Sequence, residues 1–407
     1  MVKFLNSMTM NMRKNIFVGL LISSAAFLLA SCGGQDEIYK EWIKEGGYDY
    51  PAKAINMTSL QGYQKVTLMW EKPMDPAVKR AILYWDNYAK SRDVNYDDFA
   101  DGKVTIVVDS LEDRSYTFDV VNFDADENKS LPAELTVSPY GDSWLISRSE
   151  RTVVSAIMDG DDAKIEMTKA TDEMVATRFR YKDATGAWVD FKTLLKPGTN
   201  EITLPGALKG KRFEYSSAFC PSYGRDTVWR PWTISNDGIS YKINGSRWNF
   251  TVTNGQFFGI NTVDKIFDGK YDRSAYSWHS SKADYNKLVF PKIISVDTRA
   301  SSGEEFAFTR FTFYENNTAA SLRYIKDYLV YVGSTPFDPN DTEYQINFGI
   351  PFLSGTLSIA DSQHAVVAST GATGRYIAIV FPNSWSSDGY IDLWELEPYG
   401  YIPSQAD

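Results

Sequence analysis

The sequence predicts an all-β protein made of more than one domain, and three observations support this. The chain has 407 residues, which exceeds what a single hydrophobic core usually organises. Its 25 tyrosines, 23 phenylalanines and 11 tryptophans belong to residue types that favour strands over helices. Short runs of alternating apolar and polar residues recur along the chain, separated by turns rich in Asp, Asn, Gly and Pro. We therefore expect two or three packed β-domains.

Residues 48–145 are expected to form the first domain. Turn-forming segments such as DNYAKSRD (86–93) and DADENKS (124–130) separate its apolar runs. Several half-buried strands of this length within about ninety residues predict a β-sandwich of fibronectin-III or immunoglobulin type. The predicted strands are KVTLMW (65–70), RAILYW (80–85), KVTIVV (103–108), SYTFDVVNF (115–123) and AELTVSP (133–139).

Residues 146–238 repeat this rhythm and predict a second fibronectin-like sandwich. Arg178 and Arg180 alternate with Phe179 and Tyr181, as expected for a strand with one solvated and one buried face. The two sandwiches would then be a diverged tandem pair. The predicted strands are VVSAIM (153–158), DAKIEMT (162–168), VATRFRYKD (175–183), WVDFKTL (188–194), NEITLP (200–205), RFEYSSAF (212–219) and DTVWRPW (226–232).

The N-terminus has the features of an export signal. Lys3, Arg13 and Lys14 precede an apolar run of about fifteen residues, shorter than the roughly twenty that a membrane-spanning helix needs. The run ends in LASC (29–32), which matches the bacterial lipobox, whose cysteine is lipidated. We expect residues 1–31 to be a lipoprotein signal peptide, Cys32 to be the lipidation site and residues 32–47 to be a lipidated tether. Each buried acyl methylene contributes about 0.8 kcal/mol, so two or three chains anchor a protein stably.

Two further resemblances concern the first half of the chain. Residues 35–37 (QDE) resemble the signal that sends Bacteroidota-type lipoproteins to the outer face of the outer membrane, and the alternative is an ordinary solvated tether. Residues 36–151, with the motifs EGGYDYPAK (45–53), QGYQKVTLMW (61–70) and PYGDSW (139–144), resemble an uncharacterised N-terminal domain family of Bacteroidota surface lipoproteins. These resemblances imply a lipid-anchored protein of the outer membrane facing the extracellular side, and they bring no known chemistry.

Residues 242–402 carry a more informative set of motifs. KIFDGKYDRSAYSWHS (265–280) resembles the first loop of discoidin, or coagulation-factor type C, domains. YIKDYLVYVGSTPFD (324–338), GRYIAIVFPNSW (374–385) and IDLWELEPYG (391–400) follow in the order of that family. The resemblance implies an eight-stranded galactose-binding-type jelly roll, the architecture also found in carbohydrate-binding modules. The segment PKIISVDTRASSGEEF (291–306) departs from the family pattern, so the identity of the ligand does not carry over.

The resemblance also implies a structural calcium. In such domains the first loop often wraps this ion, which takes about six to eight oxygen ligands. Asp268, Asp272 and Ser274 lie in the loop, and Glu395 on the closing strand would complete the shell. The alternative is a metal-free turn. The position of Trp278 in the motif implies a packed core side chain rather than a sugar contact.

Ligand binding is expected on the loops at one end of the jelly roll, because variable segments gather there on a rigid scaffold. Trp385, in PNSWSSDGY (382–390), is the best candidate for an aromatic platform, with Asn383 and Asp388 as polar neighbours. Arg310 and Asn316, on either side of FTFYE (311–315), would bond vicinal hydroxyls. The alternative for each of these residues is ordinary solvated surface.

Composition and motifs argue against several functions. The formal net charge of −10 argues against a nucleic-acid partner, since nothing would neutralise the phosphates. The chain has only two histidines and no HExxH, GxSxG, phosphate-loop or dinucleotide motif. A pair of glycosidase carboxylates leaves no sequence signature, so that chemistry stays open at this point.

The sequence thus predicts a non-catalytic outer-membrane surface lipoprotein that binds glycan through its C-terminal domain. It would serve a polysaccharide-capture system beside an outer-membrane transporter. The alternative is an adhesin or cell-surface assembly protein that binds a protein partner, and a third hypothesis is a spacer. No cofactor other than calcium is expected.

Overall fold

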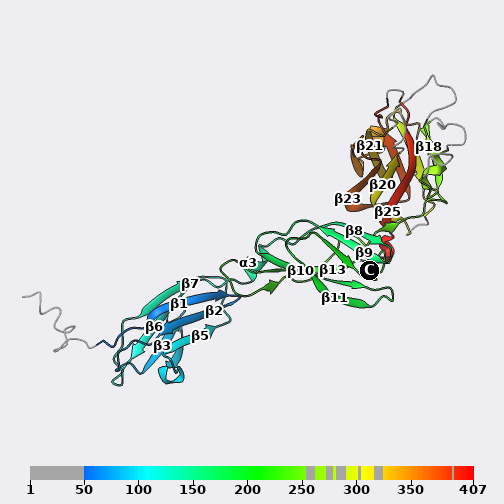
Figure 1. Ribbon diagram of the computed structural model, residues 1–407. Coiled ribbons are helices and arrows are strands. Elements are labelled where there is room, and N and C mark those ends of the chain that lie inside the picture. Colours follow the sequence, from blue (N-terminus) through cyan, green and yellow to red (C-terminus); the bar gives the residue numbers. More distant parts are fainter. Residues whose placement is uncertain are drawn as a thin grey trace, which may run out of the picture. The chain divides into compact units, whose positions relative to one another are not determined.

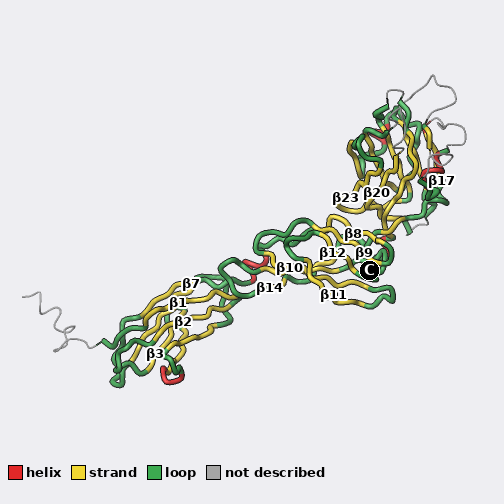
Figure 2. Tube along the Cα trace, viewed as in Figure 1, coloured by secondary structure: helices red, strands yellow, loops and turns green. Residues whose placement is uncertain are grey.

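The computed structural model describes residues 50–253, 262–271, 278–280, 290–300, 304–315, 324–386 and 389–407. Strands make up nearly all the regular structure in this part of the chain (Figure 2), so the all-β prediction is confirmed. No helix among these residues is long and apolar enough to cross a membrane. The predicted signal peptide, Cys32 and the tether lie outside the described residues.

The chain divides into two compact units. The first comprises most of the segment before Pro139 and holds the first sandwich. The second runs from Pro139 to Asp407, together with the short segments Gln61–Lys65 and Ser110–Asp113. Both the second sandwich and the C-terminal jelly roll belong to this second unit, and Figure 1 shows the strands of the sandwich in green and those of the jelly roll in yellow-green to red.

The first unit has the strand order of a fibronectin-III-like sandwich. Three strands, in the order β1-β2-β5, form one sheet, and four strands, in the order β4-β3-β6-β7, form the other. Val66, Leu68 and Trp70 alternate toward the core from β2 and are at most 1% exposed. The strands are β1 (Ile55–Gly62), β2 (Lys65–Glu71), β3 (Arg80–Trp85), β4 (Lys90–Asn95), β5 (Lys103–Val108), β6 (Tyr116–Phe123) and β7 (Ala133–Val137).

Two strands of this sandwich were missed by the sequence prediction. The segment 86–93 is only partly a turn, because β4 begins at Lys90 and pairs with β3. Asp86, Asn87 and Tyr88 make the turn, each with a positive φ. Since β4 is an edge strand with Val94 as its buried residue, it lacks the alternation that marks a half-buried strand. β1 is also an edge strand and is mostly exposed.

The second sandwich repeats this order. One sheet has the order β12-β9-β8, and the other has the order β11-β10-β13-β14, with β15 also paired to β13. The predicted strands of residues 146–238 are present, except that the last, 226–232, is strand only at Val228–Trp229, and β15 begins just beyond it. The strands are β8 (Val153–Asp159), β9 (Asp162–Met167), β10 (Met174–Lys182), β11 (Trp188–Leu195), β12 (Glu201–Leu204), β13 (Glu214–Phe219), β14 (Val228–Trp229) and β15 (Thr233–Ile234).

The C-terminal domain is a jelly roll in which the described residues form two packed five-stranded sheets, two strands more than the eight that the resemblance implies. One sheet has the order β16-β25-β20-β23, with β18 also paired to β25, and the other has the order β17-β19-β24-β21-β22. The extra strands are the two-residue pieces β16 (Tyr241–Lys242) and β18 (Trp278–His279). The others are β17 (Asn249–Val252), β19 (Lys292–Asp297), β20 (Phe306–Glu315), β21 (Asp327–Gly333), β22 (Leu353–Thr356), β23 (Gln363–Gly374), β24 (Tyr376–Phe381) and β25 (Asp392–Tyr401).

Aromatic side chains fill the space between the two sheets of the jelly roll. Phe308, Phe311 and Phe313 point inward from β20 and are fully buried. Phe313 and Trp278 both contact Phe381 of the opposite sheet, at ring-centroid distances of 6.3 and 6.1 Å. Trp278 is 1% exposed, so the expectation that it is a packed core residue is confirmed.

A chain of buried hydrogen bonds joins Trp70, Tyr96 and Asn122 in the first sandwich, and its contribution to stability can be tested. Tyr96 accepts a hydrogen bond from Trp70 Nε1 (3.2 Å) and donates one to Asn122 Oδ1 (2.7 Å), and all three side chains are buried. Tyr96→Phe leaves both partners unsatisfied, so we expect a loss of about 1–3 kcal/mol. Hydrogen exchange of the β2 and β6 amides in the full-length chain measures it.

Tyr88→Phe is the matched control, because Tyr88 is 53% exposed and its hydroxyl bonds Asp119 at the surface. We expect a change within about 0.5 kcal/mol for this surface hydroxyl. Equal loss of protection in the two variants would contradict a stabilising role for the buried chain.

Candidate functional site

Trp385 is fixed in place by the loops around it. It follows β24, and its backbone N–H donates to Tyr324 O at 3.0 Å beside the Ile325–Ser384 bridge. Its indole Nε1 donates to Leu357 O at 3.2 Å. The side chain is nevertheless 38% exposed, and Lys326 Nζ lies 4.8 Å from the ring centroid. The ring is therefore a rigid aromatic surface with a cation beside it.

Asn383 lies next to this platform and joins its two loops. Its Oδ1 accepts from Asp327 N at 3.1 Å, and its Nδ2 donates to Asp327 Oδ2 at 2.7 Å. Thr356 Oγ1 donates to the other oxygen of Asp327 at 2.5 Å. These hydrogen bonds, with that of Thr356 the largest, lower the pKa of Asp327. Asn383 thus positions the carboxylate of Asp327, a neighbour of the platform that the sequence did not single out.

Arg310 does not join Trp385. It lies in the middle of β20, paired with Val367 and Tyr399, and its guanidinium lies 5.1 Å from the Tyr399 ring centroid. Glu315, at the end of β20, accepts from Ile325 N and therefore marks the Trp385 end of the domain. Five residues of strand separate the two, or roughly 17 Å. Asn316 and Asp388, the other predicted ligand-binding residues, lie outside the described residues.

Glu395 is a buried carboxyl at the edge of a groove in the jelly roll. It is 2% exposed, and its Oε2 accepts from Gly269 N at 3.1 Å. Asp268, the C-cap of the 3₁₀ helix η3 (Val263–Phe267), lines the same groove of about 370 Å³, together with Asn244 and Ser246. Asp272 and Ser274, the other predicted calcium ligands, lie outside the described residues.

Burial raises the pKa of Glu395 to about 8. The Gly269 N–H and the nearby Lys242 oppose this rise, whereas the charges of Asp268 and Glu397 add to it. A buried carboxyl that is held close to another carboxyl is costly to ionise unless a cation accompanies it. A cation beside Asp268 and Glu395 would remove this cost. Among the described residues, however, no three Asp, Glu, His or Cys side chains gather as a metal site.

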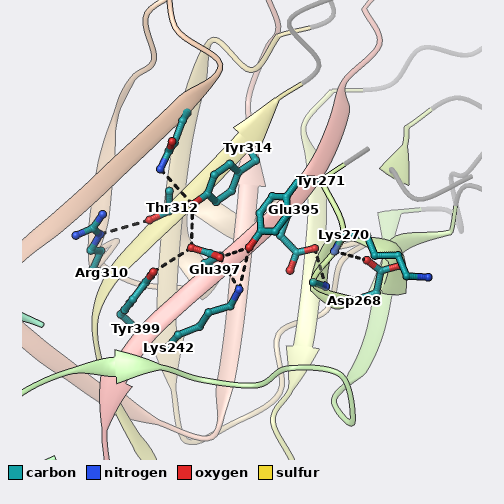
Figure 3. Close-up of polar contacts among 12 residues, drawn as sticks. Lys242, Asp268, Lys270, Tyr271, Arg310, Thr312, Tyr314, Glu395, Glu397 and Tyr399 are labelled. Atoms are coloured by element: carbon teal, nitrogen blue, oxygen red, sulfur yellow. Dashed lines mark hydrogen bonds and ion pairs between the residues drawn. The ribbon is translucent and has the colours of Figure 1, made fainter. Parts of the chain in front are cut away.

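Glu397, two residues further along β25, has the opposite environment (Figure 3). Lys242 Nζ donates to it at 2.5 Å, Tyr314 and Tyr399 donate at 3.0 Å each, and Tyr271 donates as well. Burial opposes its ionisation, but the hydrogen bonds from Lys242 and Tyr271 outweigh this and lower the pKa of Glu397. Figure 3 shows Glu395 directed toward the Asp268 loop and Glu397 toward the tyrosines.

Two neighbouring carboxyls whose pKa values move apart are the pattern of an acid–base pair. Here the oxygens of Glu397 already accept hydrogen bonds from a lysine and three tyrosines. Those contacts leave it little capacity to act on a substrate. Glu397 is instead the centre of a network that joins β16, β20 and β25.

One family model matches part of this chain. Residues 32–225 match DUF4998, a domain of unknown function, so the match covers the first sandwich and most of the second and ends before β14. No curated protein sequence matches the chain.

Among solved structures, a family 32 carbohydrate-binding module of NanJ from C. perfringens, in complex with galactose, is 16% identical. It covers 40% of this chain and 99% of its own, with a TM-score of 0.31. The SusE-like protein BT2857 is 9% identical and covers 85% of this chain and 96% of its own, with a TM-score of 0.31. Two fibronectin type-III domains of chicken tenascin are 13% identical and cover 44% of this chain and 97% of their own, with a TM-score of 0.20.

We expect the stability of the chain to depend on pH because of Glu395, when stability is measured with a chelator present. Its pKa is about 8 when folded against an ordinary 4.5, so between these values the folded chain binds more protons than the unfolded chain. This contribution to stability is complete at low pH and is lost as the pH rises toward 8. Glu395→Gln stays neutral, so its melting temperature relative to the wild type is expected to rise between pH 5 and pH 8.

Differential scanning fluorimetry of the full-length chain in EDTA measures this difference. Glu343→Gln, an exposed glutamate next to the short helix α4 (Tyr344–Asn347), is the matched control. Parallel melting curves against pH for the wild type and Glu395→Gln would contradict the assignment.

Proposed function

We propose that this chain is a non-catalytic, lipid-anchored protein of the outer-membrane surface that binds glycan through the Trp385 end of its jelly roll. The observation that supports this most is the Trp385 ring itself. It is 38% exposed although hydrogen bonds fix both its backbone and its indole nitrogen. An aromatic side chain that is held rigid and left open is suited to stacking on the C–H face of a pyranose.

The neighbours of Trp385 supply the polar contacts that such a ligand needs. Lys326 lies against the ring and can donate hydrogen bonds to hydroxyls. Asp327 can accept them, since Asn383 and Thr356 already orient its carboxylate. Because these groups are held in place before the ligand arrives, little rotamer entropy is lost on binding.

The rest of the chain would place this module outside the cell. Cys32 would carry the acyl chains, and the two sandwiches would space the jelly roll from the membrane. In this arrangement the protein would present captured polysaccharide to an outer-membrane transporter and its associated enzymes. Catalysis is not part of the proposal, because the carboxyl pair Glu395 and Glu397 is committed to the fold.

We also propose that calcium binds beside Glu395. Asp268 and Glu395 would be two of its ligands, and the ion would hold Glu395 ionised. Calcium is then expected to raise the melting temperature of the wild type more at pH 8 than at pH 5, because ligation requires the deprotonated carboxyl. Glu395→Gln should lose this response.

A protein partner is the second candidate. Ile346 and Ile350 are 77% and 94% exposed, one on α4 and the other just after it. Exposed aliphatic side chains this close together favour a protein surface over a sugar. An adhesin would use this segment and leave Trp385 dispensable.

Trp385→Ala tests the glycan proposal. We expect native gel migration of the full-length chain in detergent to be retarded by at least one polysaccharide of a broad panel. Loss of stacking is worth about 1–3 kcal/mol for an aromatic platform, so affinity should fall by roughly 5-fold to 150-fold. Retardation should stay unchanged in Tyr223→Ala, where the replaced ring is 55% exposed on the second sandwich. A folded wild type that no polysaccharide retards would contradict the proposal.

Cys32→Ala tests the anchor separately. The variant lacks the thioether position, so we expect it to move from the membrane fraction to the soluble fraction of lysed cells. In intact cells the wild type should be cleaved by added protease, and a periplasmic control protein should not. Membrane association that persists in Cys32→Ala would rule out lipidation at this residue.

A further inference from the structure

The second sandwich carries an alternating stack of cations and tryptophans on the outer face of its larger sheet. Arg178 lies 4.4 Å from the ring centroids of both Trp229 and Trp232. Arg180 lies 4.7 Å from Trp232 and 5.5 Å from Trp188. The series ends at Lys182, whose Nζ lies 5.5 Å from the Trp188 centroid. We call these residues the cation–π ladder.

A break in one strand makes the ladder possible. Trp229 and Trp232 are three residues apart, so in a regular strand their side chains would point to opposite faces. Ala218 pairs with Trp229, but Glu214 pairs with Ile234, which leaves one extra residue on the β14–β15 side. Pro231 lies in this bulge, where its missing N–H removes no ladder bond. Both rings therefore reach Arg178.

Trp188, near the end of the ladder, remains open to solvent. It begins β11 opposite Lys182 of β10, and at 52% exposure it is the most exposed tryptophan among the described residues. The ladder thus fixes an indole that is not needed for the core. Burial of this ring would have been favourable, so its exposure on a rigid support suggests a binding role.

Trp188 lines a groove of about 470 Å³, a volume within the range of small-molecule sites. Ile234, which is 55% exposed, adds a second apolar side chain. We call this hollow the Trp188 groove, and its lining residues include Lys182, Trp188, Arg212, Glu214, Ile234 and Asp407. The C-terminal segment reaches it because Arg212 N donates to Ala406 O at 2.9 Å.

Among the described residues, the ion pairs of the groove leave one cation, Lys182, without a carboxylate partner. Arg180 pairs with Glu214, and Arg212 pairs with Asp407 at 3.2 Å. The ammonium of Lys182 forms no ion pair with any carboxylate of the described residues, and the Nε of Arg212 is buried without a hydrogen-bond acceptor there. A ligand that carries one negative charge beside an apolar face would complement this arrangement.

We propose that the Trp188 groove binds a carboxylated saccharide, a uronic acid residue of an acidic polysaccharide. The pyranose C–H face would stack on the Trp188 indole, and the sugar carboxylate would pair with Lys182. Glu214 would accept a hydrogen bond from a hydroxyl group of the sugar ring. Arg180 contacts only its Oε2, so Oε1 is available to the ligand. This site is separate from the Trp385 end of the jelly roll and does not depend on the function proposed for it.

Binding of the full-length chain in mild detergent to polygalacturonate, alginate and hyaluronan tests the proposal, measured by isothermal titration calorimetry. We expect at least one of the three to bind. Its fully methyl-esterified form should bind about tenfold more weakly, because the ester cannot form the charged pair with Lys182. Poly-glutamate, which carries carboxylates without sugar rings, should bind no better than the ester.

The variants separate this groove from the Trp385 site. Trp188→Ala should reduce affinity for the acidic polysaccharide about tenfold or more, since a stacked ring is lost. Lys182→Gln, which keeps the packing of the strand, should remove the difference between the acid and its ester. Tyr223→Ala, with its exposed ring elsewhere on the same sandwich, should bind as the wild type does.

Three results would overturn the proposal. One is that none of the three acidic polysaccharides binds. Another is that poly-glutamate binds as tightly, which would mean that charge alone, or an acidic protein, is recognised. The third is that Trp385→Ala abolishes binding while Trp188→Ala and Lys182→Gln retain it, which would assign the acidic glycan to the jelly roll.

Discussion

The placement of β25 is the constraint on which the C-terminal domain depends. This strand lies between β16 and β20, so the first and last strands of the jelly roll are neighbours. One face of it contributes Leu393 and Leu396 to the core, whereas Glu395 and Glu397 hold polar clusters. Close pairing requires Gly400, since a Cβ there would lie 2.2 Å from Ala307 O.

The two glutamates of β25 show how one strand can hold two different electrostatic environments. Glu397 is surrounded by donors from β16, β20 and the Asp268 loop, so it is stable as a carboxylate. Glu395 is buried beside the carboxyl of Asp268, and the single Gly269 N–H does not offset that burial, so the protonated form is favoured. The first glutamate closes the sheet, and the second makes the stability of the domain sensitive to pH and, we propose, to calcium.

The sequence predicts strands with a buried face well and edge strands poorly. The run 65–70 alternates clearly and forms β2, whereas β4 is almost entirely exposed and carries no alternation. Trp385 could be singled out as a candidate because an aromatic residue among loop-forming residues is conspicuous. The sequence could not show that Arg310 lies far from Trp385, because it does not show where along β20 Arg310 lies. The cation–π ladder was missed because its rings and cations come from separate strands, and a bulge brings them together.

Both proposed sites hold an aromatic ring by contacts that serve no core. Trp385 is held by hydrogen bonds to Tyr324 and Leu357, and Trp188 is held by Arg180 and Lys182. In each case a cation lies against the ring and leaves part of it exposed. The two sites therefore share a fixed, partly exposed aromatic ring beside a cation, although they lie in different folds. Glycan recognition at each site would require this arrangement.

Hydrogen exchange of the full-length chain, with and without a polysaccharide that retards it, tests the central claim most directly. The account predicts added protection at residues 324–327 and 383–386, because the ligand would cover the loops that hold Trp385. Protection confined to residues 346–350, with none near Trp385, would contradict it and favour a partner at the exposed isoleucines.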